Sequence, residues 1–249
     1  MRRFYLPLPE CRSEHVVLTG NEAHHAADVL RVKPGDEVAV LDGAGGELTC
    51  RVDTVTRKKV QLTVRSRSTA PPPPWRITLV QAIPKGKMFE AIIQKATELG
   101  VWRIVPLLSK RVTTHLEGDS IEHKAEKWRQ TAVEAIKQCG QRWLPQVDQP
   151  MTLPPLLLRG DKFDLTLVAS LQDDCRHLHA YFPAGAPRPR EICIWIGPEG
   201  DFAPEEMESI KGAGALPITL GPLILRSETA ALCALSIINH ELSAPQVAA

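Results

Sequence analysis

Two glycine-containing turns near the C-terminus have the residue types that best suit a binding site. Residues 197–201 (GPEGD) directly follow the apolar run 192–196, and residues 220–222 (LGP) end the apolar run 216–220. In open α/β sheets, ligands bind outside the carboxyl ends of the strands, where glycine lets a small molecule approach the backbone. A single Gly-Pro turn often only reverses the chain. Two such turns joined by one short helix favour a shared site, and their apolar flanks suit adenine and ribose better than a triphosphate.

The motifs of several common nucleotide-binding and hydrolytic sites are absent from the sequence. No P-loop (GxxxxGK[ST]) occurs, and neither residues 43–46 nor residues 212–214 complete the GxGxxG fingerprint of dinucleotide sites. There is also no GxSxG and no HExxH motif. The six cysteines form no CxxC pairs, so we interpret them as reduced structural thiols and expect no metal site.

The elements that would hold the two turns alternate between strand and helix. Gly100 and Gly140 end two predicted helices, and Pro204, followed by two glutamates, suits the start of a third. Such alternation predicts a mostly parallel α/β sheet. The last helix is apolar nearly all round, so we expect its own domain, a second subunit or both to enclose it. Strands are expected over residues 76–82, 101–108, 165–171, 192–196 and 216–220, and helices over residues 88–99, 120–139, 204–212 and 227–242.

The first 70 residues are instead rich in short β-prone runs, interrupted by one helix. Strands at this spacing predict a small barrel. Four consecutive prolines at residues 71–74 form a stiff spacer, which predicts a domain boundary. We therefore expect a β-barrel domain over residues 1–72 and an α/β domain over residues 73–249. The β-prone runs lie at residues 16–18, 37–41, 48–55 and 59–64.

The charge is unevenly distributed along the chain. Residues 1–143 contain 23 Lys and Arg against 16 Asp and Glu, whereas residues 144–249 contain 7 against 13. The basic part could bind a polyanion such as nucleic acid, although a solvated basic surface explains the excess equally well. No apolar run reaches the roughly 18 residues needed to span a bilayer, and the N-terminus lacks the apolar core of a signal peptide. We therefore expect a cytoplasmic protein with no membrane segment.

Four blocks of the sequence point to one family. The blocks are HHAADVLRVKPGD (residues 24–36), KATELGV (95–101), IGPEGDF (196–202) and LGPLILRSETAAL (220–232). In content and order they resemble the RsmE family, the uridine-N3 methyltransferases of 16S ribosomal RNA in the SPOUT superfamily, along essentially the whole chain. Two residues depart from the family pattern: Asp201 stands where a second glycine is usual, and Ser227 where threonine is common.

The resemblance implies a PUA-like RNA-binding barrel followed by a SPOUT methyltransferase domain with a deep trefoil knot over residues 192–242. The periodicity alone predicts an unknotted sheet, because true knots are rare. The resemblance also implies S-adenosylmethionine as methyl donor, ribosomal RNA or the small ribosomal subunit as substrate, a role in ribosome biogenesis, a homodimer and no metal. The implied cofactor-binding residues are Ala169, Ser170, Leu171, Ile196, Gly197, Pro198, Glu199, Gly200, Leu220, Gly221, Ile224, Leu225, Thr229 and Ala230.

Methylation of uridine N3 needs a methyl donor aligned with a nitrogen that loses its proton. The site therefore needs a base, or a positive group that stabilises the uridine anion. The candidate catalytic residues are Arg226 for anion stabilisation and Glu228 for hydrogen bonding or proton acceptance. Arginine and glutamate at a helix start often only cap and pair, and Glu199 could serve instead. The expected RNA-binding residues are Arg2, Arg3, Arg31, Lys33, Lys85, Lys87 and Arg111.

Two other functions remain compatible with the sequence. A non-catalytic RNA-binding or ribosome-assembly protein with a degenerate SPOUT fold would lack methyl transfer; the intact glycine turns, Arg226 and Glu228 argue mildly against it. A dinucleotide-dependent oxidoreductase would bind NAD(H), but its fingerprint is missing. Binding of S-adenosylmethionine would separate the oxidoreductase from the other two functions.

Overall fold

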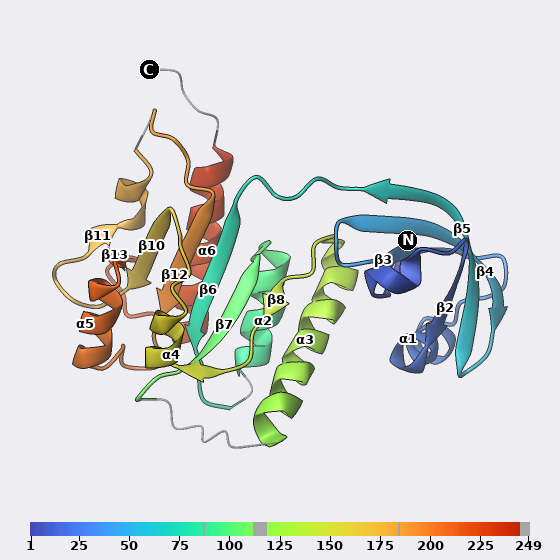
Figure 1. Ribbon diagram of the computed structural model, residues 1–249, viewed down its shortest axis with the longest axis horizontal. Coiled ribbons are helices and arrows are strands. Elements are labelled where there is room, and N and C mark those ends of the chain that lie inside the picture. Colours follow the sequence, from blue (N-terminus) through green and yellow to red (C-terminus); the bar gives the residue numbers. More distant parts are fainter. Residues whose placement is uncertain (87, 112–118, 184, 245–249) are drawn as a thin grey trace. The chain divides into compact units, whose positions relative to one another are not determined.

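The computed structural model of the 249-residue chain describes residues 1–86, 88–111, 119–183 and 185–244. The chain forms two compact units, and Figure 1 labels most of their elements. One unit comprises residues 1–72 and 133–144, and the other comprises residues 73–132 and 145–249. Each unit has its own sheet and its own hydrophobic core.

The first unit is built on a five-stranded sheet in the order β1-β3-β4-β5-β2. β1 runs parallel to β3, and the other neighbouring strands are antiparallel. Leu48, Cys50 and Val52 of β4 point inward at every second position and pack with Phe4 and Leu18 in one core. The β-rich character predicted for this part is therefore confirmed. Its elements are β1 (Arg2–Tyr5), the 3₁₀ turn Leu8–Cys11, β2 (His15–Thr19), α1 (Gly20–His24), the π-helical turn His25–Val29, β3 (Glu37–Leu41), β4 (Gly46–Val55) and β5 (Lys59–Thr69).

Long-range contacts attach the segment 133–144 to this unit. Lys137 is only 6% exposed, and its ammonium lies 2.6 Å from a carboxylate oxygen of Glu22. Gly45 has φ 95°, and a Cβ there would lie 2.6 Å from the indole ring of Trp143. Glycine is therefore required at that close approach.

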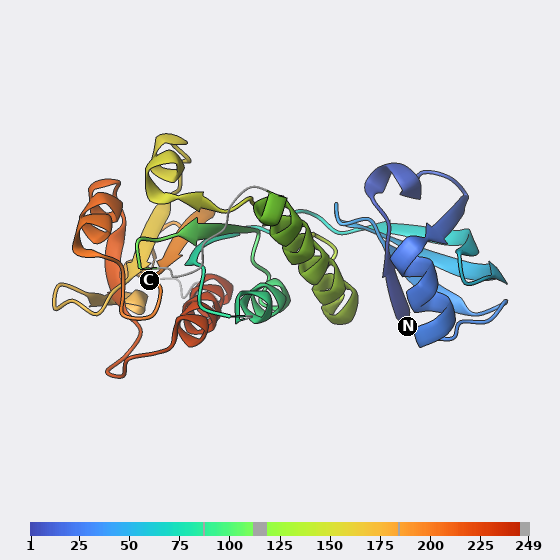
Figure 2. The same ribbon diagram turned by 90° about the horizontal axis from the view of Figure 1, so that it is seen from below.

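The second unit holds a parallel eight-stranded sheet in the order β11-β13-β10-β12-β6-β7-β8, with β9 also paired to β7. Figure 2 shows α2 and α6 on one face of this sheet and α4 and α5 on the other. The predicted parallel α/β sheet is therefore confirmed. The elements are β6 (Arg76–Ala82), α2 (Met88–Glu98), β7 (Arg103–Leu108), α3 (Asp119–Cys139, whose last turns belong to the first unit), β8 (Gln146–Val147), β9 (Met151–Thr152), α4 (Leu153–Leu158), β10 (Leu165–Ala169), β11 (Arg176–His177), the 3₁₀ turn Leu178–Tyr181, β12 (Glu191–Ile196), α5 (Pro204–Gly212), β13 (Leu216–Thr219) and α6 (Ser227–Ser243).

The strand that leads to the first glycine turn is buried on both faces. In β12, Ile192, Ile194 and Ile196 alternate with Cys193 and Trp195, and all five are at most 6% exposed. Cys193 and Trp195 share a core with residues of α4 and α5. Burial on both faces explains why this stretch is a continuous apolar run rather than an alternating one. Among the described residues, no helix is long and apolar enough to cross a membrane.

Candidate functional site

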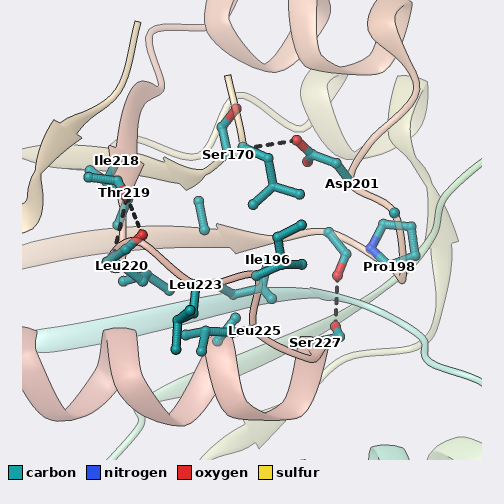
Figure 3. Close-up of a pocket in the computed structure, with 17 residues that line it drawn as sticks. Ser170, Ile196, Pro198, Asp201, Ile218, Thr219, Leu220, Leu223, Leu225 and Ser227 are labelled. Carbon is teal, nitrogen blue, oxygen red and sulfur yellow. Dashed lines mark hydrogen bonds between the residues drawn. The ribbon is translucent and has the colours of Figure 1, made fainter. Parts of the chain in front are cut away.

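A pocket opens where three parallel strands of the second unit end. Its walls are the segments that follow β10, β12 and β13, together with the first turn of α6 (Figure 3). β10 pairs with both β12 and β13, so the three carboxyl ends are adjacent. The pocket is lined by Ala169, Ser170, Leu171, Ile196, Gly197, Pro198, Gly200, Asp201, Ile218, Thr219, Leu220, Gly221, Leu223, Ile224, Leu225, Ser227 and Ala230.

Most of the residues expected to bind a cofactor lie in this pocket. Glu199 and Thr229 do not line it; both are exposed, Glu199 in the first glycine turn and Thr229 in the first turn of α6. Asp201 and Ser227 line the pocket although they were not expected to, and they are the two residues that depart from the family pattern. That departure is the signal in the sequence that could have singled them out. The other lining residues outside the expected set are Ile218, Thr219 and Leu223.

Ser227 fixes the start of α6 to the first glycine turn. Its hydroxyl donates to the carbonyl oxygen of Gly197 at 2.7 Å and accepts a hydrogen bond from Nε2 of Gln81 at 2.8 Å. Gln81 is fully buried in β6, its Nε2 also donates to the carbonyl oxygen of Ala82, and its Oε1 has no partner among the described residues. One buried chain of hydrogen bonds therefore joins β6, the glycine turn and α6. Because Gly197 and Ser227 both line the pocket, this chain holds the pocket in shape.

Asp201 ties the first glycine turn to the loop after β10. Its carboxylate accepts hydrogen bonds from the backbone N–H of Leu171 at 3.2 Å and from that of Phe202 at 2.7 Å. Figure 3 shows its side chain reaching toward the loop that carries Ser170. Its φ of 70° is a left-handed conformation, in which aspartate is found more often than most residues. In the same turn, a Cβ on Gly197 would lie 3.2 Å from the backbone nitrogen of Phe202, so a side chain there would crowd the turn.

Arg111 supports the same turn from outside the pocket. Its guanidinium donates to the carbonyl oxygen of Gly200, a residue with φ 83°. Close by, the buried carboxylate of Glu206 accepts hydrogen bonds from the backbone N–H of Lys110 at 2.9 Å and from that of Ala203 at 3.2 Å. The segment that carries Arg111 is thereby attached to the start of α5. Although Arg111 was expected to contact RNA, its guanidinium binds the pocket turn.

Arg226 and Glu228 flank the pocket without lining it. Arg226 is exposed and immediately precedes Ser227, with the extended backbone of a helix N-cap (φ −64°, ψ 152°). Glu228 is half-buried in the first turn of α6. Neither side chain forms a hydrogen bond or an ion pair with the described residues.

The other residues expected to contact RNA differ in what they already bind. Arg2 pairs with the carboxylate of Asp36 at 2.8 Å. Arg3 donates to two backbone carbonyl oxygens of α3, at 3.5 and 3.4 Å. Both guanidinium groups are thus partly engaged within the first unit. Of the rest, Arg31 and Lys33 are exposed in the first unit, Lys85 is exposed in the second, and Lys87 lies outside the described residues.

The pocket is mostly apolar and has a single charge. Of the described residues that line it, only Asp201 has a charged side chain. The others offer apolar side chains, hydroxyls and the backbone of three loops, a combination that suits a nucleoside held without phosphate groups. In the part of the chain that the structure describes, no three His, Cys, Asp or Glu side chains are grouped as ligands of a metal ion would be.

Comparison with known families identifies the domain types. A family model described as the RNA methyltransferase domain matches residues 71–239, and a model of the RNA methyltransferase PUA domain matches residues 18–65. The chain is 31% identical over 248 residues to the ribosomal RNA small subunit methyltransferase E of Bacillus subtilis, with 97% of each chain covered. It is 34% identical over 227 residues to the protein of that name from Synechocystis, with 90% of this chain and 72% of the relative covered.

Solved structures agree with these matches. The chain has a TM-score of 0.86 and 29% identity to the ribosomal RNA small subunit methyltransferase E of Neisseria gonorrhoeae, solved bound to S-adenosyl methionine, over 96% of this chain and 97% of that one. A structure of a Legionella pneumophila protein with the cofactor SAM bound has a TM-score of 0.88 and 32% identity, over 96% of this chain and 97% of that one.

These matches define the protein as an RNA methyltransferase that carries a PUA domain. More narrowly, the chain belongs to the ribosomal RNA small subunit methyltransferase E family, the RsmE family that its four sequence blocks resemble. The predicted family is therefore confirmed.

Proposed function

We propose that this protein transfers a methyl group from S-adenosylmethionine to N3 of a uridine in small-subunit (16S) ribosomal RNA. The observation that carries the proposal is the pocket at the carboxyl ends of β10, β12 and β13, in a chain that matches a methyltransferase E relative over nearly its whole length. Two similar structures hold S-adenosylmethionine, which supports the same cofactor here.

The pocket fits such a cofactor on chemical grounds. S-adenosylmethionine combines an adenosine with a positive sulfonium and has no phosphate, and the pocket combines apolar walls with one negative side chain, that of Asp201. Gly197, Gly200 and Gly221 expose backbone to the pocket, so a ligand can approach the chain closely. The loops 169–171, 196–200 and 220–225 would hold the cofactor.

When bound, S-adenosylmethionine supplies a methyl group that is electrophilic because its sulfur is positively charged. The protein must hold the uridine with N3 directed at that methyl group and must help N3 to lose its proton. Arg226 is our candidate for stabilising the uridine anion, and Glu228 for accepting the proton or holding the base by a hydrogen bond. Glu199, exposed in the first glycine turn, is the alternative to Glu228.

In this proposal the first unit binds ribosomal RNA or the small ribosomal subunit through its basic surface. Arg31 and Lys33 are the strongest candidates there, because both side chains are exposed. Contacts of this kind bind phosphates and position the RNA without reading its sequence. The target uridine must then unstack to reach the pocket of the second unit.

We also propose that the second unit contains the trefoil knot. β13 pairs with the edge of β10 that faces away from β12. The next element, α6, lies on the other side of β10, where it packs against α2, β12 and β6. The chain between them, residues 220–226, therefore passes the end of β12, where Ser227 is bonded to Gly197. A crystallographic chain trace in which this segment does not pass through a loop of the sheet would refute the knot.

A homodimer is a further part of the proposal. Leu171, Leu223 and Ile224 at the pocket are 57%, 75% and 81% exposed. A second copy of the chain would remove this apolar surface from water, which is favourable. We expect analytical ultracentrifugation to give twice the chain mass, and Ile224→Lys to shift the protein toward monomer. A wild-type monomer at micromolar concentration would refute the dimer.

Two experiments test the activity. Isothermal titration calorimetry should detect S-adenosylmethionine binding and no NAD(H) binding. Nucleoside analysis of 16S ribosomal RNA from a deletion strain should show one 3-methyluridine lost, and the wild-type gene should restore it while Arg226→Ala should not. If the methyluridine content never changes although the cofactor binds, a non-catalytic RNA-binding role replaces the methyltransferase assignment.

A further inference from the structure

Asp201 gives the pocket its negative charge, at a position where the resembled family usually has glycine. Of the described lining residues it alone is charged, and its half-buried carboxylate is part of the pocket wall. Arg111 and Arg226 are close in sequence or space to the pocket loops, but neither lines the pocket. A charge on a concave wall of otherwise uncharged residues is less screened than one on an open surface.

The position of this charge is fixed by the surrounding backbone. Each carboxylate oxygen accepts a backbone N–H, one from Leu171 and one from Phe202, so the side chain cannot swing into solvent without losing both hydrogen bonds. The Asp201 carbonyl oxygen lies on the outer side of the turn, 3.4 Å from the Arg111 guanidinium. The negative group is thus held at one place, between the loop after β10 and the first glycine turn.

We propose that Asp201 makes the pocket prefer positively charged S-adenosylmethionine over its product, S-adenosylhomocysteine. This inference rests on the proposed function. The two molecules differ by one methyl group and by the positive charge on sulfur, because the electron pair of the broken S–CH₃ bond stays on sulfur when the methyl group leaves. A fixed carboxylate attracts the sulfonium and has no such attraction to the neutral thioether. The same charge acts against nucleotides that carry phosphates.

The expected size of the preference follows from Coulomb's law at intermediate screening. A charge pair several ångströms apart at a partly exposed site changes affinity by about three- to tenfold. Such a factor is enough to let fresh cofactor replace spent product when the two are present at similar concentrations.

The test is the ratio of the two dissociation constants, measured by calorimetry. Asp201→Asn removes the charge, keeps the size of the side chain and tolerates the left-handed backbone. Asp173→Asn is the matched control, since it removes the same charge from an exposed residue of the neighbouring loop that does not line the pocket. We expect the ratio of the S-adenosylhomocysteine Kd to the S-adenosylmethionine Kd to fall about fivefold in Asp201→Asn and to stay unchanged in the control.

The ratio separates charge recognition from a structural role. If Asp201 only braces the loops, Asp201→Asn weakens both ligands equally and the ratio does not move, which would overturn the proposal. Asp201→Gly, which suits φ 70° and removes the whole side chain, must give the same fall in the ratio. If the wild-type protein binds neither ligand, the cofactor assignment itself fails, and this result is distinct from an unchanged ratio.

Discussion

Replacing Ser227 with alanine tests whether the buried hydrogen bonds between β6, the glycine turn and α6 support the pocket. The change removes a donor to the Gly197 carbonyl oxygen (2.7 Å) and an acceptor of Gln81 Nε2 (2.8 Å). Gln81 keeps the hydrogen bond from its Nε2 to the Ala82 carbonyl oxygen, so it loses only one of two hydrogen bonds. The buried Gly197 carbonyl oxygen, in contrast, loses its side-chain donor. The unsatisfied Gly197 carbonyl costs about 1–3 kcal/mol and the hydrogen bond lost by Gln81 about 1 kcal/mol, so we expect the free energy of unfolding to fall by about 2–4 kcal/mol.

Urea unfolding followed by circular dichroism measures this loss, and Ser227→Thr is the matched control because it keeps the hydroxyl. The threonine variant should stay within about 1 kcal/mol of the wild type. Replacing Gln81 with leucine should lessen the cost of Ser227→Ala, because the two residues share a hydrogen bond. If Ser227→Ala is as stable as Ser227→Thr and binds the cofactor equally well, the hydrogen-bond argument is wrong.

Three further predictions concern separate parts of the chain. Reversing Arg31 and Lys33 to glutamate should weaken RNA binding in a filter assay and leave cofactor affinity unchanged. Equal loss of both would contradict the proposal that the first unit binds RNA and the second binds the cofactor. Arg111→Met should weaken cofactor binding in calorimetry, because the Gly200 turn loses its guanidinium donor. Burial raises the pKa of Cys11 and Cys50 from 9.0 to about 11. The stability that these protonated thiols contribute is complete below pH 9 and is lost as the pH rises toward 11. The midpoint of urea unfolding should therefore fall between pH 9 and pH 11. The fall should be smaller in a variant with alanine at both positions.

The architecture of the second unit was predictable because its signals are local. The run 192–196, the proline at 204 and the glycines after residues 99 and 139 each mark an element boundary within a few residues, and the structure has strands and helices there. α4 (Leu153–Leu158) was missed because two prolines in its first turn look like a loop, although the first turn of a helix accepts proline. β1, β8, β9 and β11 are too short to give a periodic signal.

The interior of the site was less predictable, because its hydrogen bonds join distant residues. Ser227 meets Gln81, 146 positions earlier, and Asp201 meets Leu171, 30 positions earlier. No local pattern indicates such pairs. The glycine turns predicted where the pocket lies. The hydrogen bonds of Ser227 that hold the pocket, and the position of the Asp201 carboxylate in its wall, were visible only in the tertiary structure. The attachment of residues 133–144 to the first unit has the same cause, since it depends on Lys137 meeting Glu22.

The hydrogen bond between Gln81 and Ser227 joins β6 to the last helix, so the chain can bind a ligand in the pocket only after that helix has been made. Synthesis proceeds from the N-terminus at about 5–20 residues per second, and domains fold as their chain emerges. The strands β6, β10 and β12 are made before residue 227, but the wall that α6 contributes is not. A nascent or truncated chain that ends before α6 therefore lacks a closed pocket, and ligand binding becomes a property of the finished protein alone.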